Sequence, residues 1–330
     1  MKSFKHYNAA SIQEASALLA EHKGNARINA GGTDLLGCLK DKCLPVYPEA
    51  IINIKSIPGL DFIKGNGNVL QIGALARLAD IADSPEIKCD YPLLAEAASA
   101  IASPNIRNMA TIGGNLAQEV RCWYYRYPRQ IGGPVFCLRK GGKTCNALVG
   151  DNRYHSIFGA ATAKRRGCLA VTPSDLATAL VALDASIITS RRTIPAAAFF
   201  IPTDTHSNVL EPGEVIVEVR IPKPPQETRQ RYLRFTLRRP IDFAIVSVAS
   251  MITEINGICS DARITLGAVA PAPVRAIAAE EAIKGKVITE DVAAEAAKAA
   301  LAGAWPLAMN GYKVEIARTL VNRAILGLSD

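Results

Sequence analysis

Four of the eight cysteines in this 330-residue chain fall within one stretch of the sequence, at Cys122, Cys137, Cys145 and Cys168. Thiolates are ligands of zinc and of iron–sulfur clusters, and a structural zinc site usually contains cysteine pairs only a few residues apart. No two of these four cysteines are that close, and the wide spacing suits a chain that wraps around a larger group. It favours a [4Fe–4S] cluster with four thiolate ligands and leaves zinc or uncoordinated buried thiols as alternatives.

Other residues of this stretch bear on the same interpretation. His155 could replace one cysteine as a ligand, or simply form a hydrogen bond within the loop. Several basic side chains could offset the negative charge of a thiolate-bound cluster: Arg121, Arg126, Arg129, Arg139, Lys140 and Lys143. The remaining cysteines occur in apolar or helical contexts and are predicted to be single buried thiols: Cys38, Cys43, Cys89 and Cys259.

The segment AGGTDLL, residues 30–36, predicts a different kind of site. Its glycines allow the backbone to approach a phosphate, and free N–H groups at the start of a helix can donate to the phosphate oxygens. Thr33 adds a hydroxyl donor, whereas Asp34 is expected to cap the helix or to bind a ribose hydroxyl. The alternative is an ordinary strand-to-helix turn, since the segment is neither a dinucleotide fingerprint nor a P-loop.

A second glycine pair follows in ATIGGNL, residues 110–116, which is predicted to be a tight loop. Thr111, Gly113, Gly114 and Asn115 are its candidate binding residues. Two separate loops of this kind could together clamp the two phosphates of one dinucleotide.

The elements around these segments indicate a mixed α/β chain. A capping box at Ser11 and Glu14 begins a helix, and 26–30 and 51–54 are predicted strands on either side of a helix at 35–42. The segment 120–168 lacks apolar periodicity and is predicted to be an irregular insertion. Ser174 is expected to cap a helix that ends near Leu183. Three predicted strands, at 231–238, 244–255 and 262–270, precede three helices, which is typical of an α+β domain.

Composition excludes several classes of protein. With 49% hydrophobic and 21% charged residues, the chain is neither disordered, collagen-like nor a coiled coil. No apolar run is long enough to span a membrane, and the first residues lack the apolar core of a signal peptide. The net charge of +8 is compatible with a scattered solvated surface, a docking face for acidic partners or, last, nucleic-acid binding.

Five ordered motifs carry a family resemblance: AGGTDLL, IRNMATIGGNLAQ, PSDLATALVALDA, EPGEVIVEVRIP and LGAVAPAPVRA. Together they resemble the FAD-binding medium subunit of molybdenum hydroxylases. The cysteine-rich stretch is similar to the subset of that family which carries an extra [4Fe–4S] cluster, including the aldehyde oxidoreductase and 4-hydroxybenzoyl-CoA reductase types. The implied fold class is α+β, with a vanillyl-alcohol-oxidase-type FAD domain of two α/β subdomains and a C-terminal α+β domain with an antiparallel sheet.

The resemblance also implies domain limits and site residues. The expected domains are 1–56, 57–222 with the insertion at about 119–169, and 227–330. Cys122, Cys137, Cys145 and Cys168 become the cluster ligands, with His155 as the competitor of Cys168. The expected FAD-binding residues are Asn29, Ala30, Gly31, Gly32, Thr33, Asp34, Leu35, Thr111, Gly113, Gly114, Asn115, Arg234, Asp242 and Phe243.

By the same resemblance the chain works in a heterotrimer. A large subunit would hold the molybdenum cofactor, a small subunit two [2Fe–2S] clusters, and an external carrier such as ferredoxin or NAD would exchange electrons with the complex. We expect neither nucleic acid as a partner nor membrane insertion, and a cytoplasmic location, with co-export to the periplasm as the alternative. The rival hypotheses are a stand-alone flavin oxidase and a basic metal-binding protein that binds nucleic acid.

Overall fold

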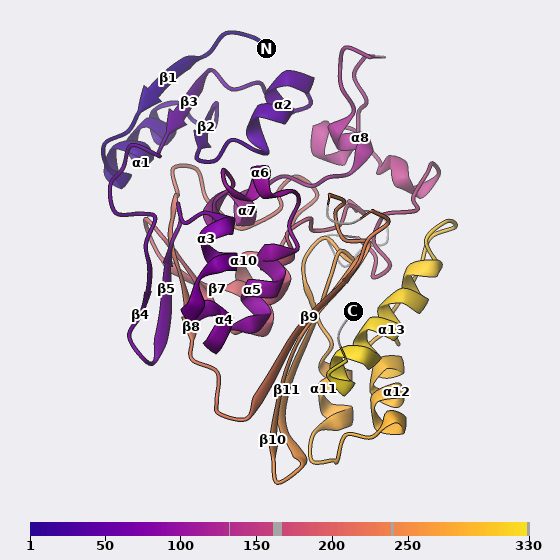
Figure 1. The fold of residues 1–330 in the computed structure, drawn as a ribbon. Helices are drawn as coiled ribbons and strands as arrows, with labels where there is room; N and C mark the ends of the chain where they lie inside the picture. The colour runs from indigo at the N-terminus through magenta and orange to yellow at the C-terminus, as the bar shows by residue number, and fades with distance from the viewer. Residues whose placement is uncertain (132, 161–166, 239–240, 329–330) are drawn as a thin grey trace.

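The N-terminal part of the chain is a small parallel α/β unit (Figure 1). The computed structural model describes residues 1–131, 133–160, 167–238 and 241–328. The sheet order is β1-β3-β2, and because parallel neighbours need crossover connections, helices lie between the strands. The elements are β1 (Lys5–Asn8), α1 (Ile12–Glu21), β2 (Ala26–Asn29), α2 (Leu35–Asp41) and β3 (Ala50–Asn53).

The second unit is built on a five-stranded antiparallel sheet of order β4-β5-β8-β6-β7. Its strands are β4 (Ile63–Gly65), β5 (Val69–Gly73), β6 (Ser186–Thr189), β7 (Thr193–Pro195) and β8 (Ile216–Pro222). Its helices are α3 (Leu78–Asp83), α4 (Pro85–Asp90), α5 (Pro92–Ser99), α6 (Pro104–Arg107), α7 (Ile112–Ala117), α9 (Asp175–Ala182) and α10 (Ala196–Phe199).

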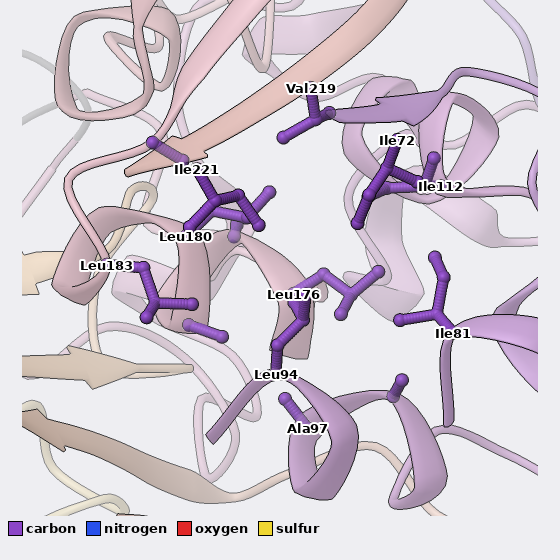
Figure 2. Close-up of a cluster of buried hydrophobic side chains, with 14 of the residues drawn as sticks. Ile72, Ile81, Leu94, Ala97, Ile112, Leu176, Leu180, Leu183, Val219 and Ile221 are labelled. Atoms are coloured by element: carbon purple, nitrogen blue, oxygen red, sulfur yellow. The ribbon is translucent and has the colours of Figure 1, made fainter. Parts of the chain in front are cut away.

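The core of this unit forms around α9, in which every residue is buried. Figure 2 shows Leu176 and Leu180 of α9 between Leu94 of α5 and the strand residues Ile72 and Val219. As predicted, Ser174 caps the helix by accepting a hydrogen bond from the Ala177 N–H at 3.0 Å. This capped helix therefore fixes the chain that follows the insertion.

The second glycine segment differs from the prediction, because residues 112–117 form the helix α7 and not a tight loop. The Thr111 hydroxyl caps this helix by accepting a hydrogen bond from the Gly114 N–H at 3.2 Å. A well-placed cap compensates for the low helix propensity of the two glycines.

Between α7 and α9 the chain is irregular, as predicted. In the described residues of this segment the regular structure is limited to short helical turns: α8 (Trp123–Arg126) and the 3₁₀ turns η1 (Leu138–Lys140) and η2 (Asn146–Leu148). Part of the predicted insertion, residues 161–166, lies outside the described residues. In Figure 1 the insertion lies at the upper right, above the C-terminal helices.

The C-terminal unit is a four-stranded antiparallel sheet of order β12-β11-β10-β9. One face packs against helices α11 and α13, on which α12 packs in turn, and the other contributes Tyr232, Ala249 and Met251 to the core around α9. Burial on both faces explains why residues 246–252 of β10 are all buried. The elements are β9 (Thr228–Phe235), β10 (Val246–Ile255), β11 (Ile258–Gly267), β12 (Val274–Arg275), α11 (Ile277–Ile283), α12 (Glu290–Ala299) and α13 (Tyr312–Leu326).

Within the described part of the chain, no helix combines the length and the apolar character that crossing a membrane requires.

Candidate functional site

A cavity of about 480 Å³ lies where the three units meet. The glycine segment after β2, the helix α7 and the loop after β9 all contribute to its wall. Every residue predicted to bind the cofactor lines it: Asn29, Ala30, Gly31, Gly32, Thr33, Asp34, Leu35, Thr111, Gly113, Gly114, Asn115, Arg234, Asp242 and Phe243. The fold therefore brings together residues from three regions that are far apart in sequence.

The first glycine segment presents unused backbone donors to this cavity. Among the described residues, none of the N–H groups of residues 31–35 has a hydrogen-bond partner. Gly31 has to be glycine, because a Cβ there would lie 2.1 Å from the Met109 carbonyl oxygen. Gly32 has a left-handed φ of +73°, which also favours glycine. The segment thus offers backbone N–H groups without a partner on the wall of the cavity, which suits an anion.

The second glycine segment behaves differently. The Gly113 N–H donates to the Ala74 carbonyl at 2.9 Å and the Gly114 N–H to the Thr111 hydroxyl, so neither amide is left for a ligand. A Cβ on Gly113 would lie 3.0 Å from the Ala74 oxygen. Glycine is required at position 113 for close packing against the chain after β5. Of the two glycine loops predicted to clamp the phosphates, the first therefore offers a row of free backbone N–H donors, whereas the amides of Gly113 and Gly114 in the second are already used.

Asp34 does not cap α2, so the first expectation for it was wrong, and its contact with a ribose hydroxyl stays a prediction. It occupies the N-cap position without a capping hydrogen bond. Its carboxylate pairs with Arg121 at 2.9 Å and Arg126 at 2.8 Å, and it accepts a hydrogen bond from the Glu119 N–H at 3.1 Å. The carboxylate therefore ties the glycine segment to the start of the insertion.

The C-terminal unit reaches the cavity through Arg234 and the loop that follows it. The buried Arg234 guanidinium pairs with Asp175 at 3.1 Å and donates to the carbonyl oxygens of Ala100 and Asp242. Burial raises the pKa of Asp175, and Arg234 opposes that shift. Arg234 thus positions the loop, on which the Phe243 ring lies 4.7 Å from the Arg121 guanidinium.

The four clustered cysteines line a second, smaller cavity in the insertion, which we call the cysteine nest. Hydrogen bonding from backbone N–H groups opposes the rise in pKa that burial causes in three of these thiols: from Tyr124 and Tyr125 at Cys122, from Arg139 and Lys140 at Cys137, and from Ala147 and Leu169 at Cys145. Such N–H···S contacts are typical of iron–sulfur sites. Cys168 lines the nest, whereas His155 does not.

Two side chains reinforce the nest. Arg139, only 3% exposed, places its Nε 3.2 Å from the Cys168 sulfur and also donates to Ser207 and to the His206 carbonyl oxygen. Its nearest carboxylate is Glu119, at 3.9 Å. The Nε2 of His155 lies 3.2 Å from the Cys122 sulfur. A buried cation with so distant a counter-ion needs an anion nearby, and a thiolate-bound cluster would supply one.

The nest does not have the geometry of a single-ion site. In the described residues no group of three or more His, Cys, Asp or Glu side chains is arranged to hold one metal ion. Burial raises the pKa of Cys122 to about 12 and also raises the pKa of Cys137 and Cys145. The thiols are therefore protonated unless a metal centre replaces the protons.

Comparison with known proteins agrees with this architecture. Residues 2–224 match the family described as FAD binding domain in molybdopterin dehydrogenase, and residues 231–328 match the CO dehydrogenase flavoprotein C-terminal domain. The chain belongs to the FAD-binding medium subunits of the molybdenum hydroxylases. It is an oxidoreductase subunit, and in this family the substrate chemistry lies on another subunit.

Individual relatives of this medium subunit align along nearly their whole length. The aldehyde oxidoreductase FAD-binding subunit PaoB of Escherichia coli K12 is 35% identical, over 98% of this chain and 97% of the relative. The carbon monoxide dehydrogenase medium chain of Hydrogenophaga pseudoflava is 30% identical, over 98% and 96%. A solved structure of carbon monoxide dehydrogenase from that organism, lacking the Mo-pyranopterin moiety, superposes with a TM-score of 0.77 at 30% identity, over 99% of this chain and 97% of that one.

Sequence reasoning missed several residues of the medium subunit's cavity. Arg121 was predicted only to balance the charge of a cluster, although it lines the 480 Å³ cavity, and Asp175, which also lines that cavity, was not predicted as a site residue. Two cysteine predictions were also wrong: Cys89 is exposed, and Cys38 and Cys43 lie close together across one turn and are not isolated thiols. The close C-x₄-C spacing of Cys38 and Cys43 was the available signal.

Proposed function

We propose that this medium subunit binds FAD in the 480 Å³ cavity and a [4Fe–4S] cluster in the cysteine nest, and that it transfers electrons within a heterotrimeric molybdenum hydroxylase. The partners would be a large subunit with the molybdenum cofactor and a small subunit with [2Fe–2S] clusters. The observation that carries this proposal is the convergence of Cys122, Cys137, Cys145 and Cys168 on one cavity in the insertion.

The residues of the larger cavity fit the cofactor as follows. The unpaired N–H groups of residues 31–35 would donate to the FAD diphosphate. Arg234 would hold the loop of Asp242 and Phe243 against the flavin end of the cavity. Bound FAD supplies the exchange of electrons singly or in pairs, and the chain supplies position and electrostatics.

The cysteine nest fits a cluster better than a single ion. Cys168 and not His155 is the proposed fourth ligand, since Cys168 lies on the wall of the nest and His155 lies against Cys122. The buried guanidinium of Arg139 would offset part of the negative charge of the cluster.

The two proposed cofactor sites are connected directly. Arg121, on the wall of the FAD cavity, is the residue before Cys122, on the wall of the nest. The ion pairs of Asp34 with Arg121 and Arg126 hold the insertion against the glycine segment. This contact would keep the distance between cluster and flavin short and constant.

Similarity to PaoB supports aldehydes as the substrate class of the complex. We further propose domain limits at 56/57 and 222/227 and an external electron carrier as redox partner. The cytoplasmic location stays a prediction.

The test is anaerobic purification of the complete complex, followed by iron, sulfide and flavin analysis and low-temperature EPR. Cys137→Ser should remove about four iron atoms per complex and the EPR signal of this cluster, while the signals of the [2Fe–2S] clusters persist. Cys259→Ser, at a buried cysteine outside the nest, is the matched control and should leave the iron content unchanged. Equal iron content in both variants would contradict the cluster assignment.

A further inference from the structure

A second pair of cysteines lies outside the nest, beside the FAD cavity. Cys38 is in the last turn of α2 and Cys43 follows Lys42, whose left-handed φ of +52° ends that helix. The Cys43 N–H donates to the Cys38 carbonyl at 3.2 Å, which folds the backbone back on itself. Both thiols are free and buried, and the turn keeps the two residues close together.

The insertion provides a cation to this pair. The Nη1 of Arg126 lies 2.7 Å from the Cys38 sulfur, so a guanidinium lies directly beside the pair. The hydrogen bond from Cys38, together with the charges of Arg126 and Lys140, lowers the pKa of Cys43 to about 7 against the effect of burial. The hydrogen bond from Cys43 and burial raise the pKa of Cys38. The pair therefore releases one proton near neutral pH and retains the other.

The two other cysteines outside the nest lack this arrangement. Cys259 is buried, its thiol donates to the Asp261 carbonyl, and burial raises its pKa. Cys89 is exposed on α4. A thiolate with a cation and a second thiol beside it is the environment that makes a cysteine reactive and gives it a resolving partner.

We propose that Cys38 and Cys43 are a redox-active dithiol that hydrogen peroxide converts to an intramolecular disulfide. In the first step the thiolate attacks one peroxide oxygen, the O–O bond breaks, and a sulfenic acid and hydroxide form. In the second step the remaining thiol attacks the sulfenic sulfur, an S–S bond forms, and the leaving hydroxide takes up the thiol proton as water. Overall, two thiols and one peroxide give one disulfide and two waters.

Disulfide formation would change the surroundings of both proposed cofactor sites. It would remove the negative charge that the pair carries beside Arg126, and the same guanidinium pairs with Asp34 of the glycine segment. Because Cys38 also lines the FAD cavity, the oxidation state of the pair would alter the charge beside the cofactor. The proposal concerns the thiols themselves and does not rest on occupancy of either cofactor site.

Peptide mapping of the intact complex tests the disulfide directly. After peroxide treatment and alkylation of free thiols, trypsin cleavage at Arg27, Lys40, Lys42 and Lys55 places Cys38 in peptide 28–40 and Cys43 in peptide 43–55. We expect the two peptides joined in the non-reduced digest and separated by reductant. Finding both alkylated at a peroxide dose that oxidises exposed Cys89 would overturn the proposal.

Variants of Arg126 test whether this guanidinium activates the cysteine pair, or whether the two thiols react only because they are close together. Arg126→Gln should slow formation of the linked peptides about tenfold at neutral pH, the effect of a rise of one unit in the thiol pKa, whereas Arg126→Lys should retain most of the rate. Cys259→Ser should form the linked peptides as the unmodified complex does. An unchanged rate in Arg126→Gln would contradict activation of the pair by the insertion.

Discussion

Replacing Asp34 with asparagine should loosen the insertion from the glycine segment. The substitution keeps the shape and an acceptor for the Glu119 N–H but removes the charge facing Arg121 and Arg126. The side chains of Asp34, Arg121 and Arg126 are between 14% and 33% exposed, which lies between an exposed and a buried ion pair. An exposed pair contributes about 0–1 kcal/mol, and breaking a buried pair costs about 3–5 kcal/mol. We therefore expect a loss of about 2–3 kcal/mol in the contact.

Hydrogen exchange of the intact complex measures this loss. A cost of about 2–3 kcal/mol raises the population of the detached insertion roughly 30- to 150-fold, because about 1.4 kcal/mol corresponds to a factor of ten. The amides of Glu119 and Arg129 are the best probes, since both donate to the segment 34–41. Asp83→Asn is the control, because the ion pair that Asp83 forms within the described structure is an exposed one with Lys88.

The reasoning would be refuted by exchange at Glu119 and Arg129 that is no faster in Asp34→Asn than in Asp83→Asn. Faster exchange over the whole chain would point to global destabilisation instead.

Two further outcomes follow from the cavity wall. Gly31→Ala should abolish FAD retention and destabilise the protein by about 1–3 kcal/mol, because the new Cβ would lie 2.1 Å from a backbone oxygen. Gly37→Ala, in the open part of α2, is the control and should be neutral or slightly stabilising. Flavin content and the thermal midpoint of unfolding, measured for both variants, test this prediction. Burial alone would raise the pKa of Glu214, but hydrogen bonds from Arg192, Glu211 and Thr189 lower it to about 2 from an ordinary 4.5. A carboxylate with a lowered pKa stabilises the fold above pH 4.5 and loses this contribution, about 3 kcal/mol, as pH falls toward 2. Stability measured in that pH range should therefore fall less in Glu214→Gln than in the unmodified protein, and parallel curves would contradict the assignment.

Much of the fold was accessible from local patterns. Ser11 and Ser174 cap helices where predicted, and the strands at 26–29 and 186–189 lie within or at their expected limits. These signals depend on residues three or four positions apart, so no knowledge of the tertiary structure is needed. The helix α7 was missed because glycine is a weak helix former, and the cap provided by Thr111 outweighs that weakness.

Residue type and order were enough to indicate the two kinds of chemistry. Paired glycines after a strand predicted an anion-binding segment, and four widely spaced cysteines predicted a group larger than one ion. Glycine conformation and thiolate chemistry are properties of the residues themselves, which is why a list of candidate residues could be written before any contact was known.

Partnerships across the fold could not be predicted in this way. Asp34 meets Arg126 across 92 positions of sequence, and Arg234 meets Asp175 across 59. Even the pairing of Cys38 with Cys43 depends on the left-handed turn at Lys42 and on a guanidinium delivered by the insertion. Ion pairs and hydrogen bonds act over a few ångströms, and the packing of distant segments sets those distances.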